Sequence, residues 1–440
     1  MNFPHWTEAI HWILFDFTFV YPLFMAWFWM VAGLMFWIKH EWRVDPNVPP
    51  KLKAYPPITI IIPMYNEGDT ARETIAQVMR QKYPDFEVIA VNDGSKDQTG
   101  AILDELMLAY PKLRVIHQAE NQGKAIGLDT AAVFAKTEYF LCIDGDALLD
   151  EDAAVWMIWH MEHGPRVAAV TGNPRVRNRS TILGRLQVGE FSSIIGLIKR
   201  AQRIYGRVFT VSGVVVLFRR AALHDIGYWS PEMLTEDIDV SWKLQLRSWD
   251  IRFEPRALVW ILMPETLTGL WKQRLRWAMG GIQTLGKYAP LFFVWRCRRM
   301  WPVYLEFLIS VVWAYLMSAA VLLWALGAVG LSLPRWLWVD TLLPGFNGLL
   351  IGVTCMAQIG VSLLFDSRYD HKLSRVYSWM IWYPVAYWLL NTLTTIWAVP
   401  KTMMRKRGSR GRWTSPDRGA HMPGAPANAT AVADASTSTP

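Results

Sequence analysis

The sequence has few of the residues that build disulfide frameworks or metal clusters. Its 440 residues include only three cysteines, Cys142, Cys297 and Cys355, which lie far apart and form no CxxC pair. The nine histidines show no spacing typical of metal ligands. This shortage excludes a disulfide framework and indicates a reducing compartment for the soluble part of the chain.

Long apolar runs, in contrast, are abundant. The chain is 52% hydrophobic and contains 25 tryptophans, a residue that collects at bilayer interfaces. The net charge of +8 is compatible with nucleic-acid binding. The basic residues lie largely beside the apolar segments, however, so we interpret them as orienting the chain in a lipid bilayer and predict no nucleic-acid partner.

The apolar runs divide the chain. Residues 10–38 are almost continuously apolar, bend near Pro22, and exceed a hydrocarbon core of roughly 30 Å at about 1.5 Å per residue. Lys39 and Arg43 then place that end in the cytoplasm. We therefore predict a transmembrane segment over 1–40, a Pro-rich linker over 41–56 and a cytoplasmic domain over 57–260. An interfacial segment follows over 261–300. Residues 301–400 are predicted to hold three transmembrane segments (303–331, 346–365 and 378–399), and residues 401–440 form a tail.

The side on which the tail lies is open. Counting four spans puts the C-terminus outside, whereas the basic run "KTMMRKRGSRGR" argues for inside. Either the stretch that contains Pro384 does not fully cross, or the charge rule fails here. From about Asp417 the tail is rich in Ala, Pro, Ser and Thr, which predicts disorder.

Between residues 57 and 260 short apolar runs alternate with helical patterns. The runs "ITIIIP", "FEVIAVND", "LRVIHQ", "YFLCIDGD" and "VAAVTGN" recur roughly every 25 to 30 residues, as βαβ units do. This rhythm predicts an α/β, Rossmann-like domain with a parallel-rich buried sheet, inserted between transmembrane helices. Ligands of such sheets bind at the carboxyl ends of the strands. The amphipathic stretch 180–202 is either an interfacial helix on the membrane or an ordinary core-facing helix.

Three carboxylates gather in "MLTEDIDVSWKLQL", where Glu236, Asp237 and Asp239 begin a helical pattern. Capping is one explanation, with Thr235 as N-cap and the acids at the positive end of the helix dipole. The other explanation is that one acid is a catalytic base.

Further polar residues follow the predicted strands. "IIPMYNE" brings Glu67 to a strand end, and "VNDGSKDQT" brings Asp93, which suits a nucleobase or ribose but also an Asx turn. Lys124 lacks the spacing of a P-loop, yet can meet a phosphate as a point charge. Asp144 and Asp146, one residue apart, suit Mg²⁺ or Mn²⁺ gripping a diphosphate; a solvated turn is the alternative.

"WKQRLRWAMGG" supplies Gln273, Arg276 and Trp277 just before the membrane region. Arginine binds phosphate oxygens in a bidentate way, and tryptophan offers a flat apolar face to a sugar ring. A positive-inside membrane anchor with an interfacial tryptophan is the simpler alternative for this segment taken alone.

Together and in this order, the motifs resemble D, DxD, TED and QxxRW of the processive, inverting family 2 glycosyltransferases, which include the cellulose, chitin and hyaluronan synthases. "EVIAVNDGS", "TGNPRVRNRS", "QVGEFSSIIGLIKRAQRIYG" and "RWTSPDRG" look like the bacterial poly-β-1,6-N-acetyl-D-glucosamine synthases of biofilm formation, over roughly residues 25 to 420. One departure is the single apolar segment before the catalytic domain, where some relatives have two.

The resemblance implies a glycosyltransferase-A domain at the cytoplasmic face of a bacterial inner membrane, using UDP-N-acetylglucosamine and a polysaccharide acceptor. It implies Asp237 as catalytic base and Mg²⁺ or Mn²⁺ on Asp144 and Asp146. By the same resemblance, the residues that contact the donor are Asp93, Glu67, Lys124, Asp144, Gln273 and Arg276. The residues that contact the acceptor are Trp277 and Glu236. It also implies a small two-span membrane partner subunit with cyclic di-GMP.

Several alternatives share these motifs. A hyaluronan, chitin or cellulose synthase shares every one of them, and only donor tests separate these enzymes. A lipid-linked monosaccharide transferase shares Asp93 and Asp146, but the QxxRW segment argues against it. A non-catalytic cyclic di-GMP receptor or transporter component would have no need of Asp237. The basic segment 405–412 suits either the dinucleotide or anionic lipid.

Overall fold

The structure is a computed structural model that describes residues 12–334, 345–371, 373–406 and 408–411, together with Thr7 and Leu337. The expected disordered tail and the "RWTSPDRG" stretch lie outside these residues.

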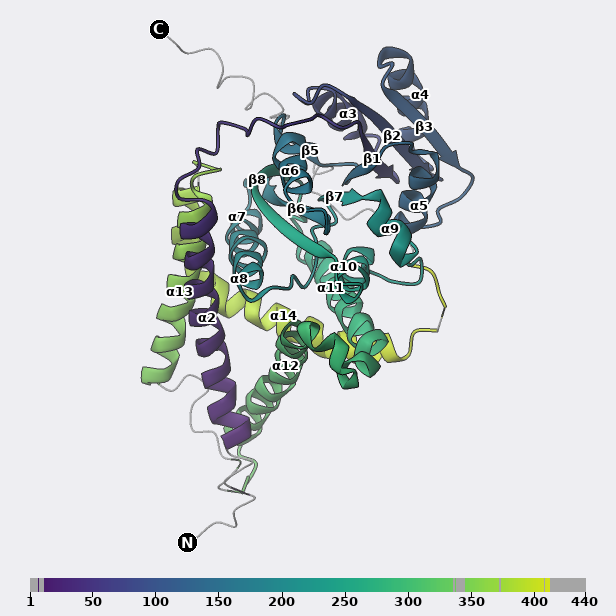
Figure 1. Cartoon of the computed structure of the whole chain (residues 1–440). Coiled ribbons are helices and arrows are strands. Elements are labelled where there is room, and N and C mark those ends of the chain that lie inside the picture. The colour runs from purple at the N-terminus through teal and green to yellow at the C-terminus, as the bar shows by residue number, and fades with distance from the viewer. Residues whose placement is uncertain are drawn as a thin grey trace.

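An eight-stranded mixed sheet forms the centre of the soluble domain, in the order β3-β2-β1-β4-β7-β6-β8-β5 (Figure 1). Strands β1 to β4 run parallel to one another, as do β6 and β8, whereas β7 and β5 are antiparallel to their neighbours. The strands are β1 (Ile58–Met64), β2 (Phe86–Asp93), β3 (Leu113–Gln118), β4 (Tyr139–Ile143), β5 (Leu148–Leu149), β6 (Val167–Val176), β7 (Val215–Arg219) and β8 (Asp250–Ile261). The predicted α/β, Rossmann-like fold with a parallel-rich sheet is confirmed.

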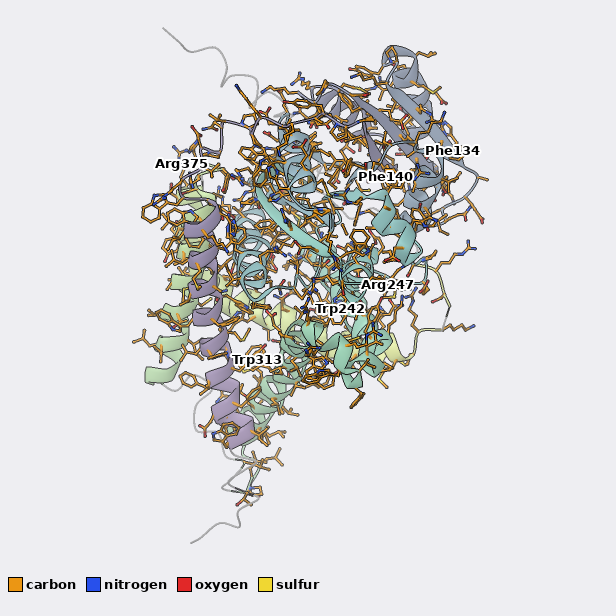
Figure 2. All side chains as sticks on the ribbon, in the orientation of Figure 1. Phe134, Phe140, Trp242, Arg247, Trp313 and Arg375 are labelled. Carbon is orange, nitrogen blue, oxygen red and sulfur yellow. The ribbon has the colours of Figure 1, made fainter. Side chains whose placement is uncertain are left out.

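Helices cover both faces of the sheet, which explains why its inner strands are continuous apolar runs. Ile60 and Ile62 of β1 face one core, whereas Ile61 faces the other, as the two-residue period of a strand requires. Phe140 of β4 is fully buried in the second core (Figure 2). The first face is covered by α3 (Ala71–Val78), α4 (Thr99–Ala109) and α6 (Ala153–Glu162), and the second by α5 (Lys124–Phe134), α9 (Arg220–Ile226) and α10 (Glu236–Leu246).

Three helices in the described chain are long and apolar enough to cross a membrane, over Trp12–His40, Trp295–Ala328 and Gly348–Asp366. The first is α2 (Phe17–His40), which follows the π-helical turn η1 (Trp12–Asp16). The second is α12 (Trp301–Ala328), which follows the 3-10 turns η3 (Ala289–Phe293) and η4 (Trp295–Met300). The third is α13 (Gly345–Asp366). Helices α2 and α13 run side by side (Figure 1). On α12, Trp313 donates its indole N–H to the Thr18 carbonyl at 2.8 Å and so joins α12 to the first helix (Figure 2).

The stretch expected as a further span, 378–399, is not among these three helices. It divides into the 3-10 segment η6 (Leu373–Trp382) and α14 (Tyr383–Met403), which lies across the molecule below the sheet domain and packs against α11 (Leu267–Tyr288) and α12 (Figure 1). Asn391 and three neighbouring threonines make α14 more polar than a typical span. The Gly411 amide then donates to the Pro231 carbonyl at 2.8 Å. The chain thus returns to the sheet domain, which favours the hypothesis that this stretch does not fully cross.

The amphipathic stretch 180–202 forms one continuous rod of α7 (Ile182–Glu190), the π-helical η2 (Phe191–Leu197) and α8 (Ile198–Tyr205). The rod packs against α2, α13 and η6 and is mostly buried. These contacts favour the core-facing interpretation, and whether the rod also lies at the membrane interface stays a prediction.

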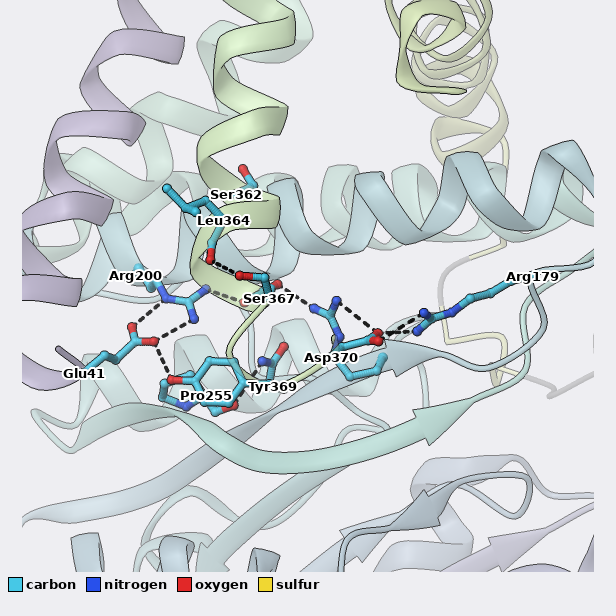
Figure 3. A network of polar contacts seen from close by, with 12 residues as sticks. Glu41, Arg179, Arg200, Pro255, Ser362, Leu364, Ser367, Tyr369 and Asp370 are labelled. Carbon is cyan, nitrogen blue, oxygen red and sulfur yellow. Dashed lines mark hydrogen bonds and ion pairs between the residues drawn. The ribbon is translucent and has the colours of Figure 1, made fainter. Parts of the chain in front are cut away.

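A buried network of ion pairs joins the membrane helices to the sheet (Figure 3). The Arg200 guanidinium on α8 contacts both Glu41 oxygens at 2.7 and 2.9 Å, and Asp366 at the end of α13 at 3.0 Å. Asp366 also accepts from Arg175 of β6 at 2.5 Å. The Tyr369 hydroxyl donates to Glu41 at 2.6 Å. The network therefore fixes the ends of two membrane helices to the second half of the sheet.

We expect Arg200→Met to destabilise the protein by about 3–5 kcal/mol, because removing one member of a buried ion pair leaves uncompensated charges behind. Thermal unfolding of the full chain in detergent measures the loss. Arg72→Met is the matched control, since it breaks a solvent-exposed pair with Glu105, and exposed pairs contribute little to stability. Equal melting temperatures for the two variants would contradict a supporting role for the network.

Candidate active site

A cavity of 650 Å³ opens at the carboxyl edge of the sheet and continues between α2, α12, α13 and α14. The predicted site residues that line it are Lys124, Asp144, Asp146, Glu236, Asp237, Gln273, Arg276 and Trp277. Glu67 and Asp93 are not part of its described lining. The cavity therefore brings three of the four motifs, DxD, TED and QxxRW, together with Lys124 and continues from them into the membrane region.

The turn Asp144-Gly145-Asp146 follows directly on β4. Gly145 leaves little room for a side chain, because a Cβ there would lie 3.0 Å from Met64 Cγ and 3.1 Å from Glu67 Cγ. Its carbonyl accepts from the Thr74 hydroxyl at 2.9 Å. Glu67 thus packs behind the turn and supports the two carboxylates that line the cavity.

Asp93 ends β2 and holds the loop before α5. Its carboxylate accepts from the backbone amides of Gln122 at 2.7 Å and Gly123 at 2.9 Å. Burial raises the pKa of Asp93, and these two hydrogen bonds oppose the shift. Its predicted contact with the donor stays a prediction.

Lys124 begins α5 and connects two motifs. Its ammonium lies 2.5 Å from Asp144 Oδ1 and 3.2 Å from Glu236 Oε1, and it donates to the Gly213 carbonyl at 3.1 Å. Burial lowers the pKa of Lys124, but the two facing carboxylates more than offset this, so the pKa lies above its usual value. Lys124 is therefore a fixed positive charge between DxD and TED.

Asp237 lies in the first turn of α10. Burial and the adjacent Glu236 raise the pKa of its carboxyl to about 6, against the opposing charges of Lys124 and Arg276. Its Oδ1 accepts from the Ile238 amide at 2.9 Å. A carboxylate with a pKa near the working pH is suited to general-base chemistry.

The prediction that the Thr235 side chain caps α10 is wrong. Thr235 occupies the N-cap position, but its hydroxyl makes no cap hydrogen bond and is buried without a partner in the described structure. It packs instead on α11, where a Cβ at Gly280 would lie 2.0 Å from its Oγ1. Asp239 accepts from Lys287 at 2.7 Å and from Tyr288 at 2.8 Å. These contacts hold the TED and QxxRW helices together.

Helix α11 presents Gln273, Arg276 and Trp277 to the cavity. Between them, the buried Arg274 pairs with the buried Glu190, while its guanidinium lies 4.3 Å from the centre of a Trp277 ring. Trp277 is thereby held at a fixed orientation on the cavity wall. The segment is more than a membrane anchor, since its side chains complete the site.

The two acids of the DxD turn can hold one divalent cation only if other groups supply the remaining oxygen ligands. In the part of the chain that the structure describes, no three His, Cys, Asp or Glu side chains form a metal-binding group. Mg²⁺ in nucleotide enzymes is held by one or two carboxylates, with the remaining oxygens from phosphates and water. Asp144 and Asp146 match that arrangement.

Among the charged residues of the cavity lining that sequence reasoning missed are Lys199 of α8 and Glu306 of α12. Glu306 accepts from the Trp29 indole at 3.0 Å, from Gln202 at 3.2 Å and from the Tyr205 hydroxyl. A lone acid within an apolar run was an available signal for it. Lys199 gave none, because it is one of several basic residues at the end of an amphipathic pattern.

Comparison with known proteins shows the family of the chain. Residues 56–280 match the family model described as "Glycosyltransferase like family 2". The chain is 40% identical over 414 residues to a poly-beta-1,6-N-acetyl-D-glucosamine synthase of Staphylococcus aureus (strain MSSA476), covering 92% of this chain and 98% of that one. A Staphylococcus epidermidis protein of the same name is 37% identical over 408 residues, with the same coverage.

Among solved structures, the chain is similar to a mannosyltransferase from Pyrobaculum calidifontis in complex with GDP-Man and Mn²⁺. The TM-score is 0.58, with 20% sequence identity, over 90% of this chain and 99% of that one. This likeness supports the fold of the catalytic domain.

Proposed function

Because the chain belongs to glycosyltransferase family 2, and within it to the poly-β-1,6-N-acetyl-D-glucosamine synthases, we propose that it transfers N-acetylglucosamine from UDP-N-acetylglucosamine to the 6-hydroxyl of a growing polymer. The transfer is processive and inverts the anomeric centre. The product is an exopolysaccharide of the kind that builds biofilms.

The observation that carries this proposal is the half-buried Asp237 carboxylate, which lines the cavity that continues between the membrane helices. In a single inverting displacement, the acceptor hydroxyl attacks the anomeric carbon and must lose its proton. Asp237 takes that proton as general base. Its pKa of about 6 keeps most of it ionised at neutral pH, ready to accept the proton.

The donor diphosphate lies against the positive side of the site. Lys124 and Arg276 neutralise the charge that develops on the leaving UDP, and Gln273 closes over the diphosphate. A divalent ion, Mg²⁺ or Mn²⁺, on Asp144 and Asp146 would supply further charge neutralisation when bound. Asp93 and Glu67 hold the loops around the uridine, while Trp277 and Glu236 contact the acceptor sugar.

The polymer leaves along the continuation of the cavity. Support comes from its lining, which combines flat aromatic faces such as Trp29, Trp313 and Trp388 with the polar side chains of Asn391 and Gln358. Such surfaces stack against sugar rings and exchange hydrogen bonds with their hydroxyls. The growing chain is thereby kept in a path that begins at Asp237.

The chain works in the inner membrane of a bacterium, with its catalytic domain in the cytoplasm, where UDP-sugars are made. Support comes from the three helices apolar enough to span a bilayer and from Lys39 and Arg43 after the first of them. Three such helices are few for an enclosed polymer path. We therefore also propose a small two-span membrane partner subunit, with cyclic di-GMP bound between the two chains, as the family resemblance implies.

Radiolabel incorporation by membranes that contain the full chain tests the function. UDP-N-acetylglucosamine, UDP-glucose and UDP-glucuronate are offered separately with Mg²⁺, with and without cyclic di-GMP. Polymer from UDP-N-acetylglucosamine alone, degraded by a β-1,6-specific hexosaminidase, supports the proposal. Polymer from another donor would contradict the proposed product but would leave the proposed mechanism in place.

A further inference from the structure

Lys199 is a buried amine on the cavity wall to which the transfer described above gives no role. It belongs to α8, is 4% exposed, and lines the same cavity as Asp237. Its Nζ donates to the hydroxyls of Ser212 at 3.1 Å and Thr171 at 3.4 Å. No carboxylate of the described chain lies within ion-pair distance of it.

This environment differs from that of Lys124, which is paired with two acids. Burying an ammonium among hydroxyls costs free energy that an apolar side chain of similar length would avoid. A cation kept in such a place calls for an explanation in the chemistry of the cavity.

The backbone at Ser212-Gly213 connects Lys199 to the catalytic carboxylate. Lys199 holds the Ser212 side chain from one side, and Lys124 donates to the Gly213 carbonyl at 3.1 Å. A Cβ built at Gly213 would lie only 3.2 Å from Asp237 Oδ2. Asp237 therefore packs directly on a short stretch of backbone that Lys199 holds in place.

We propose that Lys199 is a positioning residue for the transfer, whose ammonium keeps the Asp237 carboxylate ionised and in place against the Ser212-Gly213 backbone. This inference rests on the proposed function, because it assigns Lys199 a role in the step that Asp237 performs. Glu236, on the same helix, repels the negative charge of Asp237. Three cations stabilise that charge: Lys124 on α5, Arg276 on α11 and Lys199 on α8.

The electrostatics agree with this geometry. Burial lowers the pKa of Lys199 to about 7, and the charge of Asp237 opposes that shift. Below pH 7 the amine is therefore cationic, and this is the range in which Asp237 titrates. Removing the cation raises the pKa of Asp237, so the base becomes protonated, and inactive, at a higher pH.

The test is the pH profile of polymer formation, measured as initial rates from pH 5.5 to 8.5 in membranes containing the full chain. The acid limb is the part of the profile in which the rate falls as the pH is lowered. In Lys199→Met we expect the midpoint of this limb to move up by about one pH unit. The rate then falls about tenfold below wild type at pH 5.5 and approaches wild type at pH 8.5, where the amine of the native protein is already neutral. Lys199→Gln, a second neutral variant, is expected to show the same shift if Lys199→Met does not accumulate.

Two variants serve as controls. Lys199→Arg keeps the charge and is expected to leave the acid limb in place, even if its rate is lower. Lys243→Met removes another partly buried cation, from helix α10, that does not line the cavity. It should not move the limb either.

The outcomes separate the inference from the proposed function. A shifted limb in the two neutral variants alone supports the role of Lys199. A rate that falls equally at every pH, with the limb in the wild-type position, overturns it and leaves Lys199 a packing role. A wild-type chain that makes no polymer with any donor overturns the proposed function, and this inference with it.

Discussion

Asp237→Asn is expected to lower polymer formation by about a hundred- to ten-thousandfold, the usual contribution of a general base. The amide has nearly the shape of the carboxylate but cannot accept the acceptor's proton. Because donor binding does not need that proton transfer, the affinity for UDP should stay close to that of wild type. Radiolabel incorporation and calorimetric UDP binding, measured on the same preparation, separate the two effects.

The pH dependence of the wild-type enzyme follows from the same residue. The pKa of Asp237 is raised to about 6, so the ionised base is lost as the pH falls through that value, and the rate should fall tenfold per unit below it. Asp225→Asn is the control and should keep the wild-type profile, because this acid is exposed on α9 and does not line the cavity. Full polymer output from Asp237→Asn would refute the assignment of Asp237 as the base.

Lys124→Met is expected to have the second-largest effect, a loss of about a hundredfold or more in rate. It removes the cation that lies between Asp144 and Glu236, so two neighbouring acids face each other without compensation. The site then repels the donor diphosphate. Unlike Asp237→Asn, this variant should bind UDP more weakly, which the same calorimetric measurement detects.

Lys96→Met is the matched control for Lys124→Met, since Lys96 is exposed on the loop that follows Asp93. It should keep wild-type rate and UDP affinity. If Lys124→Met binds UDP as tightly as this control, the lysine does not contact the diphosphate.

Much of the sheet was predictable because its signals are local. "FEVIAVND" and "LRVIHQ" are β2 and β3 with the predicted bounds. β2 is buried on both faces and is therefore almost continuously apolar, whereas β3 is the edge strand and is mostly exposed or half-buried. The convergence of DxD, TED and QxxRW was also predictable. Asp144 follows a strand of the parallel half of the sheet, where such residues gather at the carboxyl edge.

What the sequence did not reveal depends on contacts between distant segments. Thr235 has the residue type of an N-cap, but its close packing on Gly280 decides its environment. The apolar content of 378–399 resembles a span, yet α14 packs along α11 and α12. The path of Lys199 into the cavity depends on how α8 packs against α2, which no local pattern specifies.

The ion pairs that join sheet and membrane helices also set an order of events during synthesis. Arg175 is 191 residues ahead of its partner Asp366. At about 5–20 residues per second, the ribosome needs about 10–40 s to cover that distance. Throughout this interval the arginine has no counter-charge, so the second half of the sheet cannot reach its final packing. The second half of the sheet, although it is made first, therefore gains this buried ion pair only after α13 has been made.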